Sequence, residues 1–82
     1  SSGNEVDILY CTGHEAVPIE IKSGETLNED FFSGFQYFRK HVSPASPRQV
    51  LVYGGKRRET RNSIEVTDIR GLTDILRSIE EA

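Results

Sequence analysis

Two short segments near the start of the chain alternate apolar with polar residues, which is the period of a β-strand. The first covers residues 5–10 and the second covers residues 16–23. Between them, residues 12–15 (Thr-Gly-His-Glu) are typical of a turn. The connection is too short for a parallel crossover, so we predict an antiparallel β-hairpin.

Phenylalanines at helical spacing predict a helix that ends near residue 41, with Thr26 or Asn28 as its N-terminal cap. Such an aromatic stripe usually packs into a core, although it can also form a platform for stacking bases. The apolar run at residues 50–53, closed by two glycines, predicts a buried strand. Strand, helix and strand then predict a right-handed βαβ crossover.

The remaining residues predict a basic loop at residues 56–62 and a short strand around Ile64 and Val66. Apolar residues at helical spacing from Leu72 to Ile79 predict a final amphipathic helix. This order predicts an α+β or α/β fold, with a small mixed β-sheet and helices packed on it. The length of 82 residues predicts one domain, residues 1–82.

Composition excludes several classes of protein. A disulfide framework within the chain needs more than the one cysteine, Cys11, so we expect a reducing, cytoplasmic setting. No apolar run approaches the ~20 residues of a membrane span, and the polar first residues do not resemble a signal peptide. Because the chain begins without methionine, at the approach to a strand, we expect it to be a fragment of a larger protein.

Charge is unevenly distributed along the chain. Residues 1–34 have a net charge of −6, residues 35–61 of +6 and residues 62–82 of −3. An ion site beside a phosphate-facing surface would give this pattern, and so would ordinary complementarity between neighbouring elements. The cations of the predicted loop could follow a nucleic acid backbone, although a solvated turn is the more common explanation. They are Lys56, Arg57, Arg58 and Arg61.

The hairpin register sets two carboxylates against each other. With the turn centred after Gly13, the numbers of opposed residues sum to 27, so Asp7 faces Glu20 and Glu5 faces Lys22. These side chains share one face, which we expect to be exposed. The opposite face, expected to be the core face, holds Val6, Ile8, Ile19 and Ile21.

Opposed carboxylates repel each other unless water screens them or a cation joins them. Together with a backbone carbonyl, Asp7 and Glu20 would supply the hard oxygen ligands that Mg²⁺ prefers. Lys22 is placed to contact a substrate phosphate or to orient a metal-bound water. On spacing alone, a solvated face is the more common explanation of these charges.

Other catalytic motifs are absent from the sequence. Gly54 and Gly55 precede basic residues but lack the spacing of a phosphate-binding loop. The two histidines are far apart and stand in no metal-binding spacing. No Ser-His-Asp arrangement is recognisable, so a serine hydrolase is not supported.

Three stretches of the chain resemble the core of the PD-(D/E)xK nuclease-like superfamily. They are Asn-Glu-Val-Asp-Ile (4–8), Val-Pro-Ile-Glu-Ile-Lys-Ser-Gly (17–24) and Leu-Val-Tyr-Gly-Gly (51–55). More narrowly, they are similar to the uncharacterised domain that follows the ATPase domain in many AAA-type ATPases of prokaryotes. The resemblance covers residues 3–55 well and residues 56–82 loosely. It implies a restriction-endonuclease-like core whose first helix and strand lie upstream of this sequence.

The resemblance also implies roles for individual residues. Asp7 and Glu20, with the backbone carbonyl of Ile21, would ligate Mg²⁺ or Mn²⁺, and Lys22 would position the nucleophile or stabilise the transition state. The implied reaction is hydrolysis of DNA phosphodiesters, and ATP would bind only in an upstream ATPase domain of the same chain. The alternative is a catalytically inactive module for interaction or oligomerisation of the ATPase. Without the first helix and strand, we expect the fragment alone to be inactive.

Overall fold

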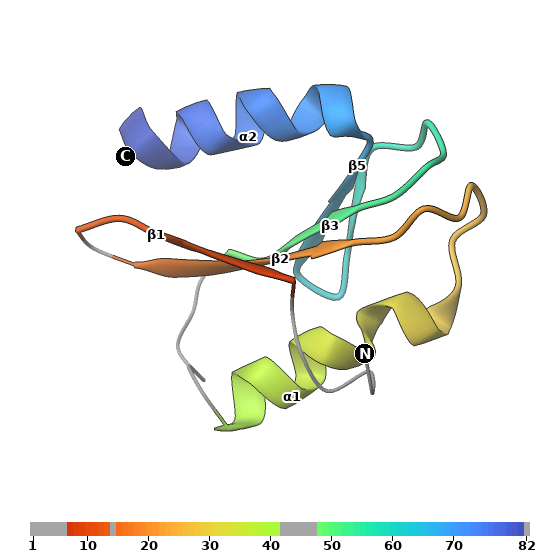
Figure 1. Cartoon of the computed structure of the whole chain (residues 1–82), viewed down its shortest axis with the longest axis horizontal. Coiled ribbons are helices and arrows are strands. Elements are labelled where there is room, and N and C mark those ends of the chain that lie inside the picture. The colour runs from red at the N-terminus through yellow and green to blue at the C-terminus, as the bar shows by residue number, and fades with distance from the viewer. Residues whose placement is uncertain (1–6, 14, 42–47, 82) are drawn as a thin grey trace.

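The computed structural model describes residues 7–13, 15–41 and 48–81, which form a five-stranded mixed sheet between two helices. Figure 1 shows α1 on one face of the sheet and α2 on the other. This arrangement confirms the expected α+β fold. Along the chain the elements are β1 (Ile8–Cys11), β2 (Ala16–Ile21), η1 (Glu29–Phe32), α1 (Ser33–His41), β3 (Val50–Val52), β4 (Glu59–Arg61), β5 (Ile64–Thr67) and α2 (Ile69–Glu81).

The strand order in the sheet is β1-β2-β3-β5-β4. The outer pairs β1–β2 and β4–β5 are antiparallel, whereas β2–β3 and β3–β5 are parallel. Ile8 lies opposite Ile19 in the first hairpin, which confirms the predicted register. The connection from β2 through α1 to β3 is the predicted crossover between parallel strands.

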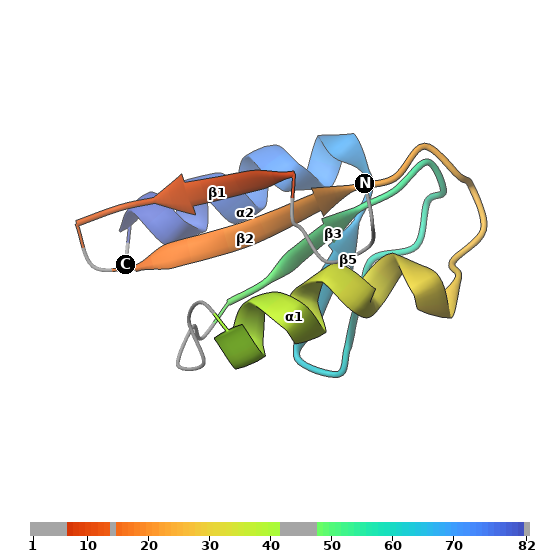
Figure 2. The same ribbon diagram turned by 60° about the horizontal axis from the view of Figure 1, so that its bottom comes forward.

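Each face of the sheet has its own apolar core, so β2 and β3 are buried on both sides. Figure 2 shows the two helices on opposite sides of these strands. The prediction that the phenylalanine stripe belongs to a core is confirmed, because Phe32, Phe35 and Phe38 are buried. The core under α1 contains Phe32, Phe35, Leu51, Tyr53, Ile64 and Val66. The core under α2 contains Val17, Ile19, Val50, Val52 and Ile79.

The predicted exposure of the hairpin faces was wrong in part, although Asp7 is exposed as predicted. Glu20 is only 3% exposed, and Pro18 is fully buried on the same face, which α1 covers. On the opposite face, Ile8 and Ile21 are each 43% exposed, although Ile19 is buried as predicted. A central strand between two helices has no solvent face, whatever the polarity of its side chains. Glu5 and Val6 lie outside the described residues.

The basic loop predicted at residues 56–62 is wrong in its second half, because residues 59–61 form the edge strand β4. Arg61 pairs with Ile64, and the two residues between them, Asn62 and Ser63, have φ angles of 53° and 68°. This is the geometry of a type I′ hairpin turn. An edge strand pairs with only one neighbour, so a polar segment such as Glu-Thr-Arg can form an edge strand.

The predicted helices form with small differences at their ends. Asn28 is the N-cap, and its side chain accepts a hydrogen bond of 2.8 Å from the amide of Asp30. The first turn is a 3₁₀ helix, and α1 follows it directly from Ser33. Pro44 and Pro47, which follow this helix in the sequence, lie outside the described residues.

The loops after β2 and β3 touch each other, and Gly54 is required for this contact. Its amide donates a 2.8 Å hydrogen bond to the carbonyl of Gly24, and a Cβ atom on Gly54 would lie 2.5 Å from the carbonyl oxygen of Ser23. We therefore expect Gly54→Ala to lower the free energy of unfolding by about 2 kcal/mol through overpacking. Urea denaturation measures this. Gly13→Ala is the control, because a Cβ there meets nothing within 4 Å; equal losses in both variants would contradict the explanation.

Candidate carboxylate site

Asp7 stands at the open end of the hairpin, next in register to Glu20. One oxygen of its carboxylate, Oδ2, accepts a 2.8 Å hydrogen bond from the amide of Ile21. A hydrogen bond with the Glu20 side chain, followed by the one from Ile21, lowers the pKa of Asp7 below its usual value. Asp7 is therefore the ionised member of the pair.

Glu20 is only 3% exposed and lies on the sheet face that α1 covers. Burial, together with the hydrogen bond and the negative charge of Asp7, raises the pKa of Glu20 to about 7. Near neutral pH, the neutral Glu20 carboxyl can donate to the Asp7 carboxylate. The two groups then share one proton, which removes the repulsion expected between opposed carboxylates.

Lys22 follows on the same strand side, and its backbone amide donates to the carbonyl of Val52 at 2.8 Å. Its ammonium lies 6.0 Å from the centroid of the Phe31 ring, at the outer limit of a cation–π contact. Its positive charge lowers the pKa of both Asp7 and Glu20. The structure thus brings together the three side chains that the sequence placed on one face.

The donor set of this site fits a small, hard divalent cation in its chemistry. The side chains of Asp7 and Glu20 are hydrogen-bonded to each other, and a divalent cation bound between two carboxylates would neutralise both charges. Over the described residues, no group of three His, Cys, Asp or Glu side chains gathers for a metal. The Ile21 carbonyl, water and substrate oxygens would have to complete the coordination of Mg²⁺, which commonly binds through one or two carboxylates.

Most of the predicted nucleic-acid-binding cations are engaged in ion pairs. Arg61 contacts Glu59 at 3.0 Å and lies over Phe32, whereas Arg57 is 3.7 Å from Glu59. Arg58 contacts Asp68 at 3.0 Å. Lys56 is exposed and lines two surface hollows near the ends of β2 and β3.

Arg48 pairs with Glu65 across the sheet, with two nitrogen–oxygen distances of 2.9 and 2.8 Å, and its Nη1 also donates to Ser78 of α2. The two-point contact with Glu65 joins the start of β3 to β5, and the hydrogen bond to Ser78 joins both to α2. Complementarity between neighbouring elements therefore accounts for part of the charge alternation along the sequence.

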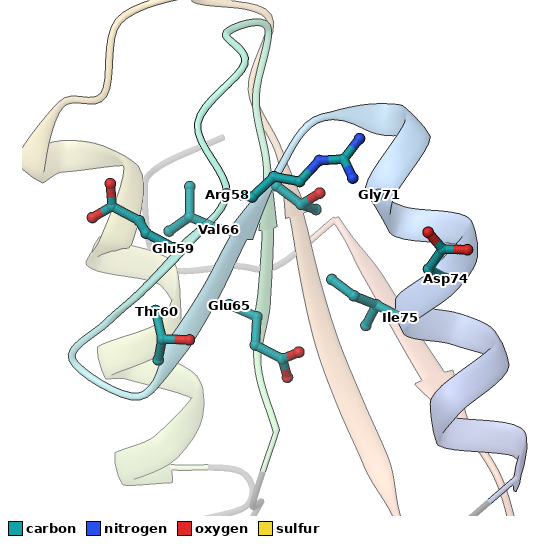
Figure 3. A pocket seen from close by; sticks show the side chains of 9 residues that line it. Arg58, Glu59, Thr60, Glu65, Val66, Gly71, Asp74 and Ile75 are labelled. Carbon is teal, nitrogen blue, oxygen red and sulfur yellow. The ribbon is translucent and has the colours of Figure 1, made fainter.

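A third hollow, of about 330 Å³, lies between the β4–β5 hairpin and α2 (Figure 3). Glu59, Glu65 and Asp74 outnumber its single cation, Arg58. Its lining does not include the carboxylate pair, so this hollow and the candidate site are separate. No sequence pattern predicted it, because its shape depends on how the consecutive elements β4, β5 and α2 pack against one another.

Neither helix described by the structure combines the length and apolarity that crossing a membrane requires. No curated protein and no solved structure matches the chain. A family model described as a domain of unknown function, DUF4143, matches residues 1–72. Since this match covers most of the sequence, the chain belongs to the DUF4143 family of uncharacterised domains, which often lie C-terminal to ATPases.

Proposed function

We propose that this chain is a cytoplasmic PD-(D/E)xK nuclease-like domain of a larger ATPase, and that it hydrolyses DNA phosphodiesters with a divalent metal. The observation that supports this proposal is the side-chain contact between Asp7 and Glu20, with the Ile21 amide hydrogen-bonded to Asp7 and the positive charge of Lys22 acting on both carboxyl groups. The family's frequent position after ATPases supports the proposed context.

In this proposal, Asp7, Glu20 and the Ile21 carbonyl would hold Mg²⁺ or Mn²⁺. When bound, the metal supplies Lewis-acid stabilisation and a more acidic water. Asp7 is already ionised and oriented by the Ile21 amide, so it provides a fixed oxygen ligand. Glu20 would release its proton to solvent in order to ligate the metal. Lys22 contributes positive charge where negative charge develops on a phosphate oxygen.

Isothermal titration calorimetry tests this site. Titrating Mg²⁺ or Mn²⁺ into the wild-type chain at about pH 8 should give saturable heat, and Asp7→Asn should lose it, because the amide removes the ionised ligand. Asp30→Asn is the control, since Asp30 is an exposed carboxylate on η1. If the wild type gives no heat, the proposed metal site is wrong for this chain. Nuclease activity should be assayed in the full-length protein that contains the domain.

An interaction module of the ATPase is the second candidate, and the edge strand β1 favours it. Ile8 and Leu9 are 43% and 45% exposed, and β1 contains no charged residue. Edges that avoid pairing usually have charges, proline or bulges. In the calorimetric test, absence of heat from the wild type favours this candidate over the nuclease.

A further inference from the structure

Besides Lys22, whose charge acts on the carboxylate pair, two cations beside the end of the sheet have no ion-pair partner among the described residues. The arginines near them are paired, Arg58 with Asp68 and Arg61 with Glu59. Lys56 and Arg70 are exposed, and neither contacts a carboxylate over residues 7–13, 15–41 and 48–81. Complementarity with neighbouring elements therefore does not explain these two charges.

Lys56 and Arg70 line the same hollow, of about 560 Å³, between the loop after β3 and the start of α2. We call it the basic hollow. It also contains Arg58 and one acid, Asp68. The Oδ1 atom of Asp68 is occupied, because it accepts from the amide of Gly71 at 2.9 Å and contacts Arg58 at 3.0 Å. The lining therefore has a net charge of +2 on a chain of net charge −3, and unpaired positive charge in a concave site attracts anions.

The loop that holds Lys56 is fixed in place. A Cβ atom on Gly55 would lie 2.5 Å from the carbonyl oxygen of Glu25 and 2.4 Å from the Tyr53 ring. The hydroxyl of Tyr53 in turn accepts a 2.8 Å hydrogen bond from the amide of Arg57. These contacts on both sides of Lys56 hold its backbone, so less conformational entropy is lost when an anion binds.

The basic hollow lies at the same end of the sheet as the carboxylate site. The parallel strands β2, β3 and β5 end in register at Ile21, Val52 and Thr67, and their following loops gather at that end (Figure 2). Two strand spacings separate Ile21 from Thr67, or about 10 Å. Duplex DNA rises about 3.4 Å per base pair along its helix axis, so a duplex lying along this edge would cover the distance in roughly three base pairs.

We propose that the basic hollow binds a backbone phosphate of a DNA strand through Lys56 and Arg70, a few nucleotides from the phosphodiester at Asp7 and Glu20. The choice of DNA rests on the proposed function. The choice of an anion rests only on the unpaired cations. Lysine acts as a point charge for a phosphate, and arginine can donate to two of its oxygens.

Fluorescence anisotropy with a labelled DNA oligonucleotide, in EDTA and over a series of salt concentrations, tests this inference. The variant Lys56→Gln/Arg70→Gln should bind about tenfold or more weakly, and its slope of log K against log salt should be shallower by roughly 1.5. The control Lys40→Gln/Arg77→Gln removes the same charge from exposed positions on α1 and α2. The Kd of this control for the oligonucleotide should lie within about twofold of the wild-type value. This change is much smaller than the roughly tenfold weakening expected when phosphate contacts are lost.

Equal weakening in the two double variants, or no binding by the wild type, would overturn the inference. A second experiment adds inorganic phosphate as a competitor at matched ionic strength. Displacement of the oligonucleotide by a low concentration of phosphate would overturn the assignment to a DNA strand. Because EDTA removes divalent metals, these results do not depend on the carboxylate site. Oligonucleotide binding that needs Lys56 and Arg70, with no heat on metal titration, would support the hollow while the nuclease proposal fails.

Discussion

Replacing Phe35 with alanine should lower the free energy of unfolding by about 3–5 kcal/mol. Phe35 is 1% exposed and packs with Leu51 and Tyr53 between α1 and the sheet, so truncation leaves a cavity in the larger core. Urea denaturation monitored by circular dichroism measures the loss. If the phenylalanines were a platform for bases instead, Phe35→Ala would weaken DNA binding without this loss of stability.

Phe31→Ala is the matched control for this prediction. Phe31 belongs to the same stripe but is only partly buried at the edge of the core. Its removal deletes less buried surface and a single distant contact with Lys22. We expect it to cost well under half of the Phe35→Ala loss, and equal losses would show that burial does not determine the effect.

Raising the pH from about 5 to about 8 should destabilise the folded chain by about 2.5 kcal/mol, because folding raises the pKa of Glu20 from 4.5 to about 7. The folded state favours the protonated form of Glu20. Its contribution to stability is therefore complete below pH 4.5 and is lost as the pH rises towards 7. The pKa of Asp7 is lowered, so it acts in the opposite direction, and only at pH values below this window.

Chemical denaturation at a series of pH values measures this effect. Glu20→Gln keeps the size and polarity of the side chain but does not titrate, so its stability should be nearly flat over the same window. Glu29→Gln, at an exposed position on η1, should keep the slope of the wild type. An undiminished slope in Glu20→Gln would show that another group causes the pH dependence.

Local patterns in the sequence were sufficient to predict the hairpin register. The short turn at Gly13 fixes which residues oppose each other, so the pairing of Asp7 with Glu20 followed from counting. The burial of Glu20 could not be predicted in this way, because it depends on an element that is distant in the sequence. Helix α1 covers Glu20, and nothing in the alternation of residues 16–21 indicates that a helix will lie on the polar face as well.

The edge strand β4 was missed for a related reason. Its residues Glu59, Thr60 and Arg61 are polar, and it is held by pairing with β5 rather than by burial in a core. The informative signal was the turn, since asparagine at position 62 tolerates the left-handed backbone that a two-residue hairpin requires. The unpaired state of Lys56 and Arg70 had no signal in the sequence, because it depends on which acids the fold brings near each cation.

The mixed strand order has a consequence for how the chain folds. The β1–β2 and β4–β5 hairpins join residues that are close in sequence, and isolated hairpins form in about 1–10 μs. Strand β3 has only parallel partners, and its pairing with β2 must wait for closure of the long segment that contains α1. Such non-local closure slows folding. The docking of β3 between two preformed hairpins is therefore the step that should limit the folding rate.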